Sequence, residues 1–138
     1  MTSQHYSIAR RGIKNISLTD CLKIQSWNVK GIKTPGKSMR FWNEVKKATD
    51  TAFWVIQEHH LDSSSQRKQA IGEKLVFYGE GGEGFSGVLT AVDRNLEPLV
   101  VMNHASGRAL AVKIKWNKLC FTIINFYGHC EAKRRAKL

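Results

Sequence analysis

The run TAFWVIQ, residues 51–57, is a continuous apolar stretch that ends on a carboxylate, Glu58. Its short length and its aromatic and β-branched residues predict a β-strand that is buried on both faces. A strand of this kind lies in the interior of a sheet, with other layers covering both of its faces. The sequence thus predicts a buried strand over residues 51–57, with Glu58 directly after it.

A second strand is predicted upstream, from Leu22 to Val29, where the sequence alternates in part and is rich in β-forming residues. Gly31 and the Thr-Pro-Gly turn at 34–36 end it. Between the two strands, apolar residues at spacings of three and four predict one helix, with Ser38 as its N-cap. Its predicted apolar face consists of Met39, Phe41, Trp42, Val45 and Ala48. Because a helix connects them, we expect the two strands to be parallel.

Downstream of Glu58 the pattern predicts mainly antiparallel β-structure. Residues 61–74 are polar and then weakly helical. Five further strands follow as a meander, at Leu75–Tyr78, Val88–Val92, Leu99–Met102, Ala109–Lys115 and Cys120–Phe126. The sequence thus predicts an α+β fold with a mixed sheet and one main helix.

The composition is strongly basic. Lys and Arg number 22 against 11 Asp and Glu, so the 138-residue chain has a formal net charge of +11 and a pI near 9.9. This excess suits a polyanionic partner such as a nucleic acid or an anionic membrane surface, and of these we expect DNA or another nucleic acid. Residues 1–21 predict a flexible basic leader in which Arg10 and Arg11 are candidate phosphate contacts. Residues 22–138 are predicted to form the domain.

Cysteine usage and hydropathy indicate an intracellular protein. Cys21, Cys120 and Cys130 form no C-x-x-C pair, and their odd number argues against a disulfide framework. Cys120 lies in an apolar run, which predicts a buried thiol. No apolar stretch reaches the roughly 20 residues of a membrane span, and the N-terminus lacks a signal-peptide core. We expect no membrane association; the basic run at 133–137 leaves a nuclear location open.

Polar side chains stand where the predicted strands end. Asn28 closes the first strand, Glu58 follows the second, and Asn125 and Tyr127 close the last. The carboxyl ends of parallel strands meet at one edge of a sheet, where sites collect. A carboxylate beside an amide suits a hard cation such as Mg²⁺, and a phenol can bond a phosphate oxygen without opposing charge.

The same stretches carry a family resemblance. They are KIQSWNVKGI (23–32), FWVIQEHHL (53–61), SGVLTAV (86–92), GRAL (107–110) and FTIINFYG (121–128). In this order they resemble successive motifs of the endonuclease/exonuclease/phosphatase superfamily, and within it the apurinic-type endonuclease domain of non-LTR retrotransposons. The resemblance runs from about Leu22 to the C-terminus. It implies the N-terminal half of the DNase I-like fold, a four-layer α/β sandwich.

The resemblance implies hydrolysis of DNA phosphodiester bonds with Mg²⁺ or Mn²⁺. By its motifs, Glu58 would ligate the metal, and Asn28 would belong to the network around the metal and the scissile phosphate. Tyr127 would contact the phosphate. His59 stands beside Glu58 at a position whose character varies among relatives.

The chain also departs from the family pattern. Relatives usually have a proline where Gly128-His129 stands, and the superfamily's Gly-Asp-x-Asn and Ser-Asp-His motifs do not occur in this sequence. Those motifs supply the acid and base groups for the attacking water. We therefore expect a truncated domain that does not turn over. Its open inner sheet face is expected to promote self-association.

Two other functions stay open on the sequence alone. The chain could be a basic nucleic-acid-binding module without catalysis, whose affinity falls steeply with salt. It could also be a phosphoesterase of the same superfamily that acts on lipid or inositol phosphates, which the basic residues Lys30 and Lys37 do not exclude.

Overall fold

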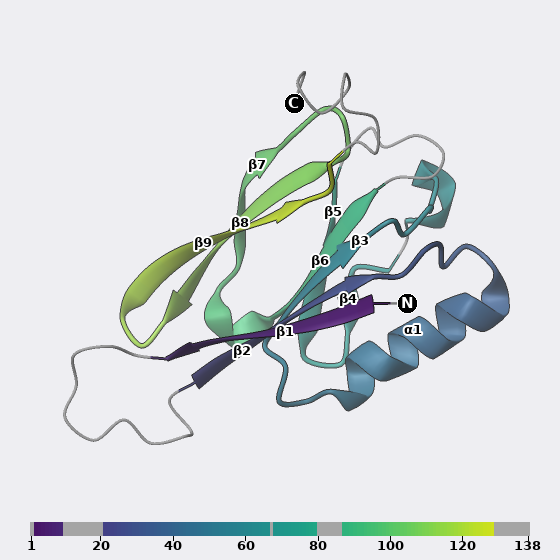
Figure 1. Cartoon of the computed structure of the whole chain (residues 1–138). Helices are drawn as coiled ribbons and strands as arrows, with labels where there is room; N and C mark the ends of the chain where they lie inside the picture. Colours follow the sequence, from purple (N-terminus) through teal and green to yellow (C-terminus); the bar gives the residue numbers. More distant parts are fainter. Residues whose placement is uncertain (1, 10–20, 67, 80–86, 129–138) are drawn as a thin grey trace.

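The computed structural model describes residues 2–9, 21–66, 68–79 and 87–128 (Figure 1). In this part of the chain, one α-helix, α1 (Pro35–Lys47), accompanies two sheets. Sheet A has the strand order β1-β2-β3-β6-β5-β4, and sheet B has the order β7-β8-β9. The strands are β1 (Thr2–Ala9), β2 (Cys21–Asn28), β3 (Phe53–Gln57), β4 (Ala70–Ile71), β5 (Lys74–Tyr78), β6 (Val88–Asp93), β7 (Leu99–Asn103), β8 (Ala109–Trp116) and β9 (Leu119–Phe126). Two 3₁₀ helices, η2 (Ser63–Ser65) and η3 (Arg94–Leu96), complete the described elements.

The first unit of the fold is β2-α1-β3. Strands β2 and β3 are parallel, with Ile24 opposite Phe53 and Asn28 opposite Gln57. On its other side β3 pairs antiparallel with β6. The predictions of parallel strands joined by a helix, and of an α+β fold with a mixed sheet, are therefore confirmed.

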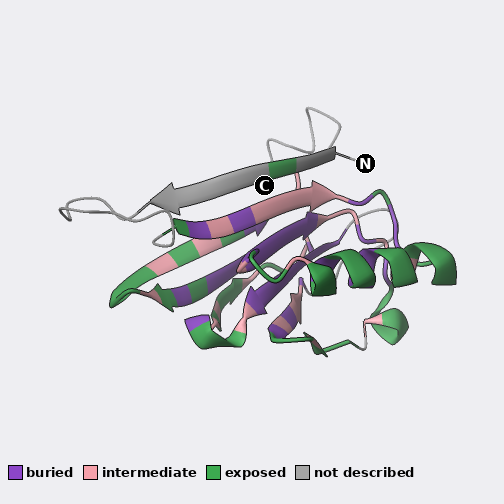
Figure 2. Ribbon diagram, turned by 90° about the horizontal axis from the view of Figure 1, so that it is seen from below, coloured by how far each residue is buried: buried purple, intermediate pink, exposed green. Residues whose placement is uncertain are grey.

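Strand β3 is central because each of its faces packs against a different layer. Trp54 and Ile56 belong to the core beneath α1, which buries Phe41, Trp42 and Val45 there. Phe53 and Val55 face the other way and pack against sheet B. The result is three layers, α1, sheet A and sheet B, with the buried residues concentrated on the central strands (Figure 2).

One buried polar side chain ties the two sheets together. Asn125, on β9, is fully buried. Its Nδ2 lies within hydrogen-bonding distance of the carbonyl oxygens of Ile56 (3.1 Å) and Leu89 (2.8 Å) and of Thr90 Oγ1 (3.2 Å). Its Oδ1 accepts from Gln57 Nε2 at 3.2 Å. Because an unpaired buried amide is costly, these bonds fix where β9 sits over sheet A.

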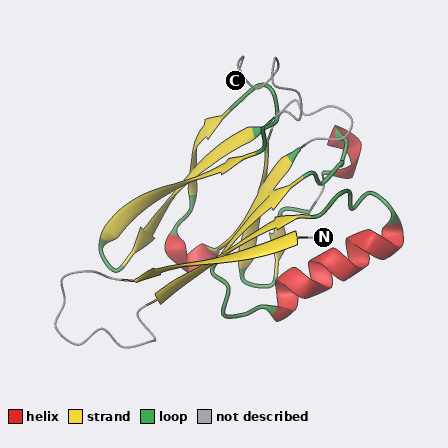
Figure 3. Cartoon of the chain, in the orientation of Figure 1, coloured by secondary structure: helices red, strands yellow, loops and turns green. Residues whose placement is uncertain are grey.

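Several local predictions are wrong. The helix begins at Pro35, with Thr34 at the N-cap and no side-chain capping bond, because proline already fits the first helical position. Ser38 is therefore not the cap, and Met39 is 63% exposed rather than part of the core. The weak helix at 61–74 is replaced by η2, β4 and the start of β5 (Figure 3).

The predicted single meander divides between the two sheets. β4, β5 and β6 form one antiparallel run within sheet A, and β7, β8 and β9 form a second one as sheet B. Cys120 is exposed, not a buried thiol. It pairs with Lys115, an exposed residue of β8, so both lie on the outer face of sheet B. Cys130 lies outside the described residues.

The predicted flexible leader is wrong for residues 2–9. They form β1, which pairs antiparallel with β2 so that Thr2 lies opposite Asn28 and Ala9 opposite Cys21. The physical reason is that the outer edge of β2 carries unpaired backbone groups that a neighbouring extended segment satisfies. Arg10, Arg11 and the rest of residues 10–20 lie outside the described residues.

The exposed apolar surface is not the inner face that we expected. The inner faces of the two sheets pack against one another. It is the outer face of sheet B that shows large apolar side chains, with Ile124 60%, Phe126 52% and Met102 37% exposed. Ala111 lies between Ile124 and Met102 in the strand register. In the described part of the chain, β9 is also an edge strand, and its sequence LCFTIINF contains no charged residue.

No helix within the described ranges is long and apolar enough to cross a membrane.

Replacing Asn125 by leucine should lower the free energy of unfolding by about 2 kcal/mol, because Gln57 and the amide-bonded carbonyls lose a buried partner. Thr122→Val, on the outer face of the same strand, should change it by less than about 0.5 kcal/mol. Urea denaturation of both variants measures the difference. Equal stability of the two variants would contradict the role given to Asn125.

The pair Ile124→Lys and Phe126→Lys should suppress concentration-dependent self-association, because the two lysines replace exposed apolar side chains on the outer face of sheet B. Thr122→Lys adds charge to the same face of the same strand without removing an apolar side chain, and should leave association in place. Analytical ultracentrifugation over a concentration series tests this. A wild-type chain that stays monomeric throughout would refute it.

Candidate functional site

The parallel pairing of β2 and β3 brings two of the predicted site residues together. Asn28 ends β2 opposite Gln57, so Glu58 follows one residue beyond the same edge. Asn28 Nδ2 donates a hydrogen bond to Glu58 Oε1 at 3.0 Å. Asn28 Oδ1 accepts from the backbone N–H of Lys30 at 3.1 Å. The amide therefore holds the carboxylate on one side and the next turn of the chain on the other.

Tyr127 reaches the same carboxylate from sheet B. It follows β9 directly, and its hydroxyl hydrogen-bonds to Glu58. Its backbone N–H donates to the Arg108 carbonyl oxygen at 2.8 Å, which continues the pairing with β8. The structure thus brings all three predicted residues, Asn28, Glu58 and Tyr127, into one hydrogen-bonded group where the two sheets meet.

The backbone around Glu58 adopts an uncommon conformation. Lys30, Glu58 and His60 all have positive φ, at 49°, 55° and 59°. The two loops brace each other, because Gly31 N–H donates to the Glu58 carbonyl at 2.7 Å and Ile32 N–H to the His59 carbonyl at 2.9 Å. Left-handed non-glycine residues cost about 1 kcal/mol or more each and cluster at functional sites. A Cβ at Gly31 would lie 2.6 Å from His60 Nδ1, so only glycine leaves room for that ring.

The hydrogen bonds keep Glu58 ionised. Partial burial by itself would raise its pKa. Hydrogen bonds from Tyr127 and Asn28, together with the charges of His60 and Lys30, more than offset burial, so the pKa of Glu58 lies below its ordinary value. His60 Nε2 lies 3.7 Å from Glu58 Oε2. At neutral pH the site therefore presents a carboxylate.

His59, beside Glu58, has a structural role. It is 1% exposed, and its Nδ1 accepts from the Leu61 backbone N–H at 2.8 Å. Burial, reinforced by the charge of His60, lowers the pKa of His59 to about 4, so the ring is neutral at physiological pH. A Cβ at Gly87 would lie 2.5 Å from His59 Nε2, which makes that glycine necessary. The two adjacent histidines therefore differ in their surroundings: His59 is enclosed in the core, and His60 faces the Glu58 carboxylate.

Two residues of the site were not predicted from the sequence. The Arg108 guanidinium lies 5.0 Å from the centroid of the Tyr127 ring, and its Nη1 donates to the Gly128 carbonyl oxygen at 3.4 Å. Gln57 links Ser26 and Asn125 beneath Glu58. Both residues belong to the motif stretches quoted above, Arg108 to GRAL (107–110) and Gln57 to FWVIQEHHL (53–61). Their partners could not be predicted, because these contacts form only when sheet B packs against sheet A.

The donor set fits a cation that keeps much of its water. The described ranges contain no group of three or more His, Cys, Asp or Glu side chains that could hold a metal ion. Mg²⁺ does not require such a group, because it is commonly bound by one or two carboxylates, several waters and the phosphates of its substrate. Glu58 can supply the carboxylate. Asn28 Oδ1 has one lone pair beyond the bond from Lys30, while its Nδ2 orients Glu58.

Comparisons with known proteins give no assignment: no protein-family model matches the sequence, and no curated protein matches it.

The buried neutral His59 should make folding stability depend on pH. With a folded pKa of about 4 against an ordinary value of 6.5, the unfolded chain binds more protons between these limits. The contribution of neutral His59 to the free energy of unfolding is therefore fully present above about pH 6.5. As the pH falls toward 4, the free energy of unfolding decreases by up to about 3 kcal/mol. His59→Gln should flatten this slope in denaturation experiments across the window. His104→Gln, at an exposed position, should keep it. An unchanged slope in His59→Gln would contradict the burial of a neutral ring.

Proposed function

We propose that this chain carries a metal-assisted phosphodiester-binding half-site on a DNase I-like fold. It descends from a Mg²⁺-dependent endonuclease that hydrolyses DNA, of the type found in non-LTR retrotransposons. The chain binds DNA or another nucleic acid and does not sustain turnover. One observation carries the proposal: Asn28 and Tyr127, from two different sheets, both hydrogen-bond to Glu58.

The chemistry of the group supports this function. An ionised carboxylate held by neutral donors suits a hard dication, and Mg²⁺ or Mn²⁺, when bound, neutralises phosphate charge and stabilises a leaving oxygen. Glu58 would hold the metal and Asn28 would orient Glu58, with its Oδ1 able to join the metal's shell. The Tyr127 hydroxyl has a single proton, which it gives either to Glu58 or to a phosphate oxygen. Arg108, against the Tyr127 ring, adds a positive charge beside that position.

Turnover requires a base for the attacking water. The neighbouring His59 is enclosed, and its Nδ1 is already occupied by the Leu61 amide. The Gly-Asp-x-Asn and Ser-Asp-His motifs, which supply acid and base groups in the superfamily that the chain resembles, do not occur in the 138 residues. The proposed activity of this chain is therefore binding of the metal and the phosphate.

The basic charge favours a second candidate, nucleic-acid binding that needs no metal. The net charge of +11 is enough for sequence-independent attraction to phosphates. The two candidates differ in one measurable respect, the effect of a divalent cation on affinity through Glu58.

Adding Mg²⁺ or Mn²⁺ should increase the affinity of the wild-type chain for a short DNA oligonucleotide. In the presence of the metal, Glu58→Gln should bind the same oligonucleotide about tenfold or more weakly than the wild-type chain. Glu73→Gln makes the same charge change at an exposed residue paired with Arg94 and should retain the gain. Fluorescence anisotropy with and without metal measures both.

Two results would contradict the proposal. A metal effect that is identical in Glu58→Gln and Glu73→Gln would leave only the metal-independent binding module. Nicking of supercoiled plasmid that Glu58→Gln abolishes would show that the chain does turn over.

A further inference from the structure

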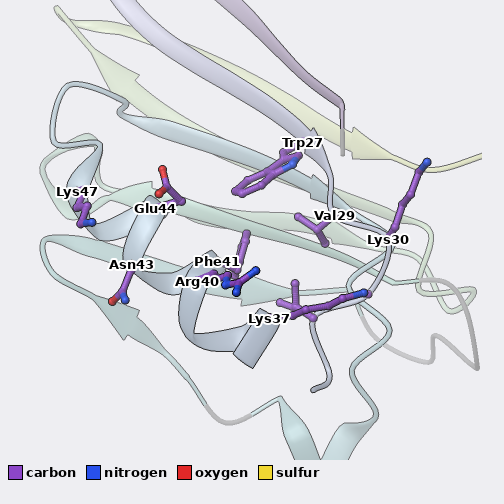
Figure 4. Close-up of a pocket in the computed structure, with 11 residues that line it drawn as sticks. Trp27, Val29, Lys30, Lys37, Arg40, Phe41, Asn43, Glu44 and Lys47 are labelled. Atoms are coloured by element: carbon purple, nitrogen blue, oxygen red, sulfur yellow. The ribbon is translucent and has the colours of Figure 1, made fainter. Parts of the chain in front are cut away.

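A groove lies on the face of sheet A opposite sheet B, between α1 and the end of β2. It has a volume of about 620 Å³. Its apolar wall includes Val29, Ile32 and Phe41, which are buried, and Trp27, which is half-buried. The Trp27 and Phe41 ring centroids are 5.6 Å apart. Figure 4 shows Trp27 above the helix, with Lys30 and Lys47 at opposite ends of the groove. We call it the α1 groove.

The rim of the α1 groove is predominantly basic. Lys37, Arg40 and Lys47 recur along one side of α1 at spacings of three and seven, and Lys30 stands at the end of β2. All four are exposed. None of them forms an ion pair within the described ranges, whereas the rim contains a single carboxylate, Glu44. An apolar aromatic wall below a ring of cations is complementary to a ligand with a flat ring and a negative charge.

Lys30 connects the α1 groove to the carboxylate site. Its backbone N–H is bonded to Asn28 Oδ1, its side chain lines the groove, and its charge acts on Glu58. Asn28 and Trp27 are adjacent on β2 and point to opposite faces of sheet A. A nucleic-acid strand whose phosphate lies at Glu58 can therefore pass over Lys30 and place the next nucleotide in the groove.

We propose that the α1 groove binds a nucleotide of single-stranded DNA next to the phosphate at Glu58. The base lies against Trp27, and Lys37 and Arg40 contact the flanking phosphates. This inference rests on the proposed function, because it takes the strand at Glu58 to be nucleic acid. A cavity of this volume accommodates one nucleotide with its water. Because the groove contacts the base through an aromatic face and the strand through its phosphates, we expect little preference among the four bases.

The phosphate contacts are tested with a fluorescent single-stranded oligonucleotide of about ten thymidines, a length within the usual site size. Anisotropy titrations over a salt series give the dependence of affinity on salt. Arg40→Gln should weaken binding and reduce the salt slope by about 0.7, the value for one phosphate contact on a single strand. Lys113→Gln removes the same charge from the outer face of sheet B and should change neither quantity.

The base contact is tested with a matched oligonucleotide that carries abasic sites in place of its bases. The wild-type chain should bind it about tenfold more weakly than the thymidine strand, because stacking on the aromatic wall is lost. Trp27→Leu should bind the two strands equally. Circular dichroism identifies a Trp27→Leu chain that has unfolded, and in that case the abasic comparison on the wild-type chain decides the point.

The outcomes separate the groove from the proposed function. Equal losses in Arg40→Gln and Lys113→Gln, or equal binding of the two strands by the wild-type chain, would overturn the groove and leave the metal effect at Glu58 intact. A metal effect that is insensitive to Glu58→Gln, with a specific loss in Arg40→Gln, would overturn the metal site and leave the groove.

Discussion

The position of Asn125 between the two sheets is the constraint on which the site depends. Its amide reaches carbonyl groups of both β3 and β6, and its Oδ1 accepts from Gln57, the residue before Glu58. Tyr127 follows two residues later, directly after β9, and lies on the same side of the extended chain, so the register that satisfies Asn125 also places the Tyr127 hydroxyl at Glu58. A slip of one residue would turn both side chains to the outer face of sheet B.

Sheet A has a different chemical character on each of its faces. Toward sheet B, the edge of sheet A carries the Glu58 carboxylate and the Asn28 amide, and the Tyr127 phenol meets them from sheet B. Toward α1, sheet A carries an aromatic wall bordered by cations. These surfaces meet at Lys30, whose positive φ turns the chain over the edge between them. Hydrogen bonds between the loops at 29–32 and 58–59 stabilise the three left-handed residues. The same bonds fix the position of the carboxylate site relative to the α1 groove.

The elements that could be predicted are those with a strong local pattern. The continuous apolar run before Glu58 indicates a strand with two covered faces, and the spacing of Phe41, Trp42 and Val45 indicates the helix. Other features depend on distant partners. β1 forms because the edge of β2 is open to pairing, and the exposure of Cys120 follows from which face of sheet B meets sheet A. Local hydrophobicity cannot distinguish the two faces of a strand when both are apolar.

The sequence by itself determined the residue types of the site and the edge where two of them meet. Asn28 and Glu58 follow parallel strands, and covalent connection through α1 is enough to align their ends. Only the tertiary structure decided that the Tyr127 hydroxyl bonds to Glu58, that Arg108 lies against the Tyr127 ring, and that His59 is enclosed and neutral. The reason is that these relations depend on the packing of sheet B over sheet A, which is set by contacts between residues more than 30 positions apart.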